Sequence, residues 1–138
     1  MRQVLATLIL VLALSASDAP AQQGDPAFEE AARSVSERMD RRREAREIGA
    51  RAAEAHEAGD FEEASALFAE QAELEPNNFV PAFNLACSLA LAGDLEQAEA
   101  ALRRSVELGF SSLSTLKRDP DLEPLRGRDL YRQLVGHW

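Results

Sequence analysis

The chain has 138 residues, of which 46% are hydrophobic and only 6% aromatic. This length allows one small domain, and frequent Ala with few aromatic side chains favours closely packed helices over a sheet, so we expect an all-α fold. The formal net charge of −9, from 24 acidic and 15 basic residues, disfavours nucleic acid and anionic membranes as partners.

Residues 1–21 are predicted to be a signal peptide. A short basic start precedes an apolar run from Val4 to Leu14, which is too short to make a good membrane span. Ala19-Pro20-Ala21 then supplies the small-x-small pattern that signal peptidases accept, which places the cut before Gln22, and Ser17-Asp18-Ala19 is a second candidate for the cleavage site. We therefore expect a periplasmic or secreted protein. An uncleaved membrane anchor is the alternative.

Residues 22–44 are predicted to form a lead-in linker and an amphipathic helix. Asp25-Pro26 combines an N-cap residue with a first-turn proline, which is typical of a helix start. Apolar residues then recur at helical spacing, namely Phe28, Ala32, Val35 and Met39. The run Arg41-Arg42-Arg43 interrupts this stripe, so the middle of the segment should be solvated.

Residues 45–78 and 79–112 are two copies of one pattern. Gly59-Asp60-Phe61-Glu62-Glu63-Ala64 returns 34 residues later as Gly93-Asp94-Leu95-Glu96-Gln97-Ala98. Each Gly is suited to the left-handed residue that ends a helix, and each Asp can cap the next helix. We therefore expect a pair of helices in each copy, joined by a Gly-Asp turn.

A 34-residue period around such a turn resembles the tetratricopeptide repeat (TPR). Leu85-Ala86 and Ala98 in the second copy, and Ala64 and Phe68 in the first, match the packing positions of that family. Arg51 stands where the family has Leu, which predicts weaker packing before Gly59. The resemblance implies a short solenoid of antiparallel helical hairpins, with the lead-in helix before it and capping helices after it.

Residues 113–138 are predicted to be that C-terminal cap. Gly109-Phe110 ends the last repeat helix, and Asp119-Pro120 has the pattern of another helix start. Together with Asn84-Leu85-Ala86-Cys87 and Asp121-Leu122, these residues resemble the closing module of TPR arrays, the TPR end-of-group type. The end of a solenoid needs such a cover because its last hairpin would otherwise expose an apolar face.

No local pattern in the sequence carries catalysis, a cofactor or a metal. Cys87 is the only cysteine, so no intramolecular disulfide can form, and a small buried apolar side chain is the expected role. His56 and Cys87 fall on the first helices of successive copies, but no third residue is visible that would orient the imidazole for a Cys-His dyad. His56 and His137 lack metal-ligand spacing. We expect a protein that is not an enzyme, with a Cys87-dependent enzyme or redox protein as the alternative.

The TPR resemblance implies a groove, lined by the first helix of each copy, that binds a protein or peptide. Its predicted residues are His56, Val80, Phe83, Asn84, Cys87 and Leu91. Either this groove is open, or leucines of the tail cover it; we favour the cover, formed by Leu113, Leu116, Leu122 and Leu130.

Charge is also segregated along the chain. Seven arginines lie between residues 33 and 51, whereas residues 52–102 contain eleven carboxylates and no Lys or Arg. This pattern indicates solvated helix faces or a complementary contact with a partner, including self-association. The expected function is an exported TPR-type interaction module, an adaptor or assembly factor of the bacterial envelope. A membrane-anchored accessory subunit is the alternative if the leader is retained.

Overall fold

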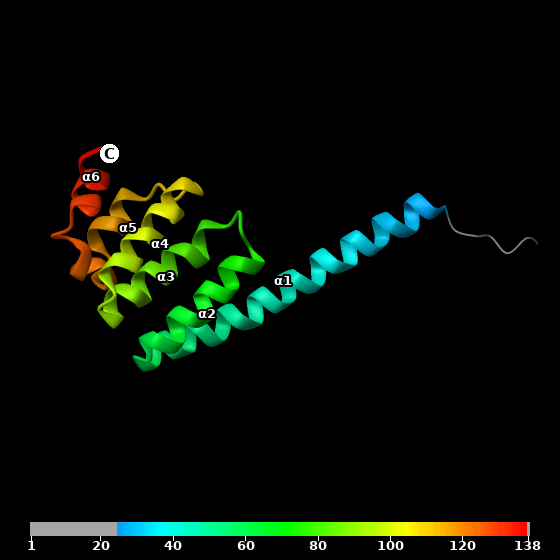
Figure 1. Ribbon diagram of the computed structural model, residues 1–138, viewed down its shortest axis with the longest axis horizontal. Coiled ribbons are helices and arrows are strands. Elements are labelled where there is room, and N and C mark those ends of the chain that lie inside the picture. The colour runs from blue at the N-terminus through cyan, green and yellow to red at the C-terminus, as the bar shows by residue number, and fades with distance from the viewer. Residues whose placement is uncertain (1–24, 138) are drawn as a thin grey trace, which may run out of the picture. The chain divides into compact units, whose positions relative to one another are not determined.

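The computed structural model describes residues 25–137, and within this range the chain folds into helices with no strand. The all-α prediction is confirmed for these residues. The helices are α1 (Pro26–Ala58), α2 (Phe61–Leu74), α3 (Phe79–Ala92), α4 (Leu95–Glu107), α5 (Leu113–Arg118), the 3-10 helix η1 (Pro120–Leu125) and α6 (Asp129–His137) (Figure 1). The predicted signal peptide, residues 1–21, lies outside the described residues.

The chain divides after Glu37 into two compact units. In the described part of the first unit, residues 25–37, every residue is exposed. Helix α1 begins there as the Asp-Pro pattern predicts, because the Ala27 amide donates a hydrogen bond to Asp25 Oδ1 at 3.0 Å. Phe28 and Val35 are 72% and 46% exposed, so the first turns of α1 leave apolar side chains in solvent.

In the second unit, α1 changes from solvated to packed without a break. The helix has 33 residues, and its buried residues are Ala45, Ile48 and Ala52. The predicted division between the lead-in and the first copy, at 44/45, therefore falls inside α1 at its first buried turn. Ile48 and Ala52 pack against Phe68 of α2, so the helix before Gly59 is packed in spite of Arg51.

The two Gly-Asp turns have the same geometry. Gly59 and Gly93 have φ values of 81° and 87°, the left-handed conformation that glycine adopts without strain. The Asp60 amide donates to the Ala55 carbonyl at 2.9 Å, and the Asp94 amide donates to the Leu89 carbonyl at 2.9 Å. These are the six-residue bonds of a Schellman helix end.

Both aspartates also cap the helix that follows. Asp60 Oδ1 accepts from the Glu63 amide at 3.1 Å, and Asp94 Oδ1 accepts from the Gln97 amide at 3.2 Å. Each cap satisfies an amide in the first turn that has no partner within its helix. The local signals in the sequence thus position the starts of α2 and α4 as predicted.

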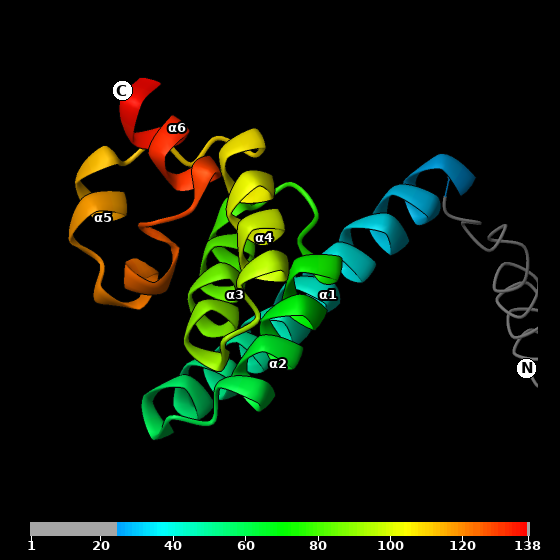
Figure 2. The same ribbon diagram turned by 60° about the vertical axis from the view of Figure 1, so that its left-hand side comes forward.

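Helix α3 is central to the second unit. It packs against α2, α4 and η1, and Figures 1 and 2 show it between α2 and α4. Ala86 of α3 and Ala98 of α4 are both 0% exposed, so the two helices approach closely through small side chains. Both residues belong to the apolar core that α3, through Phe83, Cys87 and Ala90, shares with the C-terminal residues.

The C-terminal segment packs on α3 as a cap. Its buried apolar residues are Phe110, Leu116, Leu122, Leu125 and Tyr131. The Tyr131 hydroxyl donates to the Leu116 carbonyl at 2.7 Å, which joins α6 to α5. None of the helices between residues 25 and 137 is both long and apolar enough to cross a membrane.

Candidate functional site

A pocket of about 220 Å³ lies where α1, α2, α3 and the start of η1 meet in the second unit. Its lining includes His56 from the last turn of α1, Asn84 and Cys87 from α3, and Asp119 and Asp121 from the stretch that links α5 to η1. This volume accommodates a few atoms or one side chain, and it is smaller than pockets that enclose a drug-sized ligand. The polar groups within it define the chemistry of the site.

Four of the six predicted groove residues line this pocket: His56, Phe83, Asn84 and Cys87. Val80 and Leu91 do not line it; Val80 is 43% exposed at the start of α3. The structure therefore places four of the six predicted groove residues around one pocket. Whether any of these residues binds a partner stays a prediction.

The tail covers Phe83 and Cys87 of the predicted groove, whereas Val80 stays exposed. Phe83 is 8% exposed and stacks on Phe110, with ring centroids 4.5 Å apart and an interplanar angle of 24°. Leu116 and Leu122 of the predicted cover are wholly buried in the same core, whereas Leu113 and Leu130 are not part of it. Phe83 is therefore a core residue, and the pocket is the opening that remains beside the cover.

His56 is held by two hydrogen bonds. Its Nδ1 lies 2.9 Å from Ser88 Oγ, and its Nε2 lies 3.0 Å from Asp121 Oδ2. Its ring also makes an edge contact with Phe61, at 5.3 Å between ring centroids. The imidazole thus has a fixed orientation, and Asp121 is the orienting residue that the sequence did not reveal. The two residues are 65 positions apart, and no local pattern signals such a contact.

Ser88, His56 and Asp121 form a continuous chain of hydrogen bonds, but the chain does not present a nucleophile. Ser88 is 0% exposed and is not part of the pocket lining. A hydroxyl in this position cannot reach a substrate without movement of α3, because solvent has no access to it. The arrangement joins α1, α3 and η1, and we assign Ser88 a positioning role toward the imidazole.

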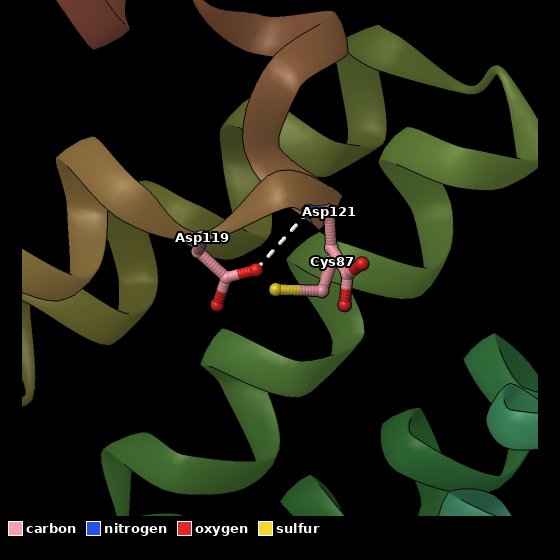
Figure 3. Close-up of side chains that lie close together, drawn as sticks. All are labelled: Cys87, Asp119 and Asp121. Atoms are coloured by element: carbon pink, nitrogen blue, oxygen red, sulfur yellow. Dashed lines mark hydrogen bonds between the residues drawn. The ribbon is translucent and has the colours of Figure 1, made fainter.

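The Cys87 thiol is 4% exposed and extends from α3 toward the acidic stretch of η1 (Figure 3). Burial raises the pKa of this thiol, and the negative charges of Asp119 and Asp121 raise it further. A reactive cysteine requires a stabilised thiolate, which depends on nearby positive charge and partial exposure. The environment of Cys87 has the opposite character, so the geometry disfavours a nucleophilic cysteine.

Asp119 and Asp121 are positioned by the start of η1. Asp119 Oδ1 accepts a hydrogen bond from the Asp121 amide at 3.1 Å, and Pro120 occupies the first turn between them (Figure 3). This local cap aims both carboxylates toward α3. One ligand atom each from Cys87, Asp119 and Asp121 lies within 4.8 Å of the other two, so these residues could hold a metal ion. No spacing in the sequence reveals this group, because Cys87 lies far along the chain from the two aspartates.

Comparisons with protein-family models, with curated proteins and with solved structures found no match to this chain.

Proposed function

We propose that this chain is an exported TPR-like helix-repeat module that binds another protein, as an adaptor or assembly factor of the bacterial envelope. The envelope location rests on the predicted signal peptide, residues 1–21. The TPR-like assignment is supported by the 34-residue offset between two Gly-Asp turns of equal geometry, and by the wholly buried Ala86 and Ala98 at the helix crossing.

The observation that carries the binding function is the exposed apolar surface at the start of α1. Phe28 is 72% exposed and Val35 is 46% exposed. With Ala32 they recur at a spacing of four and three residues, which places them along one face of the helix. A side chain as large as Phe gains free energy when it leaves water, so a helix with this face is suited to a partner that covers it.

The charged residues of α1 indicate which kind of protein could be the partner. The arginines that follow in the sequence, which include Arg38, Arg41 and Arg42, belong to the second unit and are exposed there. An amphipathic helix of this type binds in an apolar groove of a second protein, and acidic side chains at the rim of that groove would complement the arginines. The proposed partner is therefore a protein with an apolar groove and an acidic rim.

Photo-crosslinking from α1 tests the proposal. A photoreactive phenylalanine analogue replaces Phe28 in one variant and Glu30 in a matched control, since Glu30 is two positions further along the helix and faces away from Phe28. We expect one defined protein adduct in envelope extracts from position 28 and none from position 30. The intact mass of the protein in the same extract should match a chain that begins at Gln22.

The double variant Phe28→Ser and Val35→Ser completes this test. Removal of an anchoring aromatic residue commonly costs about 2 kcal/mol or more of binding, so the adduct partner should no longer co-purify with the variant. Its melting temperature should match that of the unmodified chain, because both side chains are exposed. Equal adducts from positions 28 and 30 would contradict the proposed surface. An adduct with twice the mass of the chain would identify the partner as a second copy, and retention of the leader would contradict the exported form.

A further inference from the structure

The pocket of the second unit brings together four groups that can bind a metal ion, and they come from three separate parts of the chain. Cys87 lies on α3, Asp119 and Asp121 lie at the start of η1, and His56 ends α1. The Cys87 sulfur and one oxygen from each carboxylate lie within 4.8 Å of one another. Figure 3 shows these three side chains close together. His56 lies beside them, with its Nε2 3.0 Å from Asp121 Oδ2.

The thiol is the least satisfied member of this group. Cys87 is 4% exposed, its side chain extends beside the two carboxylates, and among the described residues it has no hydrogen-bond partner (Figure 3). Two carboxylates lie beside it, and none of the described residues that line the pocket is a Lys or Arg that could stabilise a thiolate. A bound cation would supply the positive charge and would deprotonate the thiol.

The carboxylates also lack a permanent counter-charge. Within the described residues, Asp121 pairs with His56 alone, and the side chain of Asp119 accepts only the Asp121 amide. Arg126 donates a hydrogen bond to the main-chain carbonyl of Asp119 at 3.5 Å and not to its carboxylate. Two acidic side chains and a thiol therefore face one another in a half-buried pocket.

His56 has the support that a metal-binding histidine needs. Its second ring nitrogen, Nδ1, lies 2.9 Å from the buried hydroxyl of Ser88. A hydroxyl can either donate or accept a hydrogen bond, so Ser88 fits both tautomers of the ring. With Ser88 Oγ as the acceptor from Nδ1, the lone pair of Nε2 is available for an ion at the position that now faces Asp121. A fixed second partner of this kind is typical of histidines that bind metals.

We propose that Cys87, Asp119, Asp121 and His56 form a binding site for a divalent transition-metal ion, and that this ion is Zn²⁺. Sulfur and imidazole ligands favour Zn²⁺ over Ca²⁺ and Mg²⁺, which prefer oxygen, and one sulfur, one nitrogen and two oxygens complete a four-ligand site. On binding, the thiol proton leaves Cys87 for solvent as the sulfur binds the metal, and His56 binds through Nε2 as the neutral tautomer that keeps its proton on Nδ1.

Such an ion would join α1, α3 and η1 at one point. The hydrogen bonds of His56 already link these elements. With the ion bound, the Cys87 sulfur and the two carboxylates would each bind the metal. Because the unfolded chain does not hold the four ligands together, binding energy would add to the stability of the folded state. The site is thus a structural one that fixes the cap on the hairpins. It is independent of the partner surface on the first turns of α1.

Titration with Co²⁺ and Zn²⁺ tests this site on the purified chain without a histidine tag, after treatment with a chelator. Co²⁺ should bind with one equivalent and produce the near-ultraviolet absorption of a thiolate-to-cobalt charge transfer, and Zn²⁺ should abolish that absorption by displacement. At a Zn²⁺ concentration of about 100 times the dissociation constant, the melting temperature should rise by about 10 °C.

Three variants make the result specific. Cys87→Ala should lose the charge-transfer absorption entirely, and Asp119→Asn should weaken Zn²⁺ binding by about 10-fold or more. Asn keeps the oxygen that caps η1, so the second change removes charge without removal of the cap. Asp94→Asn is the matched control because Asp94 is also a helix N-cap, and it lies outside the cluster.

The outcomes separate clearly. Loss of metal binding in Cys87→Ala and Asp119→Asn, with normal binding in Asp94→Asn, supports the site. No charge-transfer absorption in the unmodified chain overturns it, as does Zn²⁺ binding of equal strength in all three variants. If Cys87→Ala does not fold, Asp119→Asn alone decides, because its helical circular dichroism signal reports folding independently of the metal.

Discussion

Small side chains set the distance between α3 and α4. Ala86 and Ala98 are both 0% exposed at the crossing of these helices. We expect Ala98→Leu to overpack this crossing and to lower the free energy of unfolding by about 1–3 kcal/mol, measured by urea denaturation. Ala100→Leu on the exposed face of the same helix is the control and should change stability by less than about 0.5 kcal/mol. Equal effects of the two changes would show that the crossing is not tightly packed.

The residues that the sequence could identify are those whose signals are local. Asp60 and Asp94 cap helices three positions away, and Gly59 and Gly93 end them, so their roles depend on neighbours in the chain alone. The contact between His56 and Asp121 has a different origin. It depends on how the cap docks across α3, and a sequence of alternating helices and turns does not specify that docking.

At the scale of elements, one ion pair connects α4 to the start of α6. Arg128 Nη2 donates to Glu99 Oε2 at 2.6 Å. This hydrogen bond lowers the pKa of the Glu99 carboxyl, and a bond from the Leu130 main chain lowers it further, although partial burial opposes both. The folded state therefore favours the ionised carboxylate. This ion pair therefore stabilises the folded state at pH values above the pKa of glutamate in an unfolded chain, about 4.3. The stabilisation is lost as the pH falls through the lower pKa that Glu99 has in the folded state.

The lowered pKa of Glu99 in the folded state gives a prediction about stability and pH. We expect Arg128→Gln to lower the urea midpoint near pH 7, and we expect this difference to disappear at acidic pH, where Glu99 is protonated in both proteins. Arg132→Gln is the control, because Arg132 pairs with Asp129 on the exposed face of α6 and should have little effect at any pH. A difference between Arg128→Gln and the unmodified chain that persists below the folded pKa would contradict the assignment.

Helix α1 continues across the predicted division between residues 44 and 45. The arginine run predicts solvated turns in the lead-in, and the far end of the lead-in is expected to run into Ile48 and Ala52. Burial and helix formation are separate properties, however. No Gly or Pro interrupts residues 27–48, so the backbone continues as helix through the solvated turns and into Ala45 and Ile48.

For the whole molecule, the C-terminal cap contributes to the core and does not merely cover an end. Deletion of residues 110–138 would remove Leu116, Leu122, Leu125 and Tyr131 and leave Phe83 and Ala90 of α3 exposed. We expect this truncated chain to aggregate, with increased light scattering and dye binding to apolar surface. Deletion of residues 1–37 is the control. The described part of that segment is fully exposed, so this chain should keep its helical signal and melting temperature. A soluble, stable 1–109 fragment would contradict the role of the cap.

The burial of Cys87 has a practical consequence for studies of dynamics. The chain has a single thiol, and that thiol is 4% exposed between α3 and the cap. An alkylating reagent too large for the pocket beside it can modify it only when this region opens, so the modification rate of the unaltered protein reports how often opening occurs. Cys87 is therefore a native probe of local unfolding: its labelling kinetics give the free energy of separating the cap from α3, with no engineered residue and no attached dye.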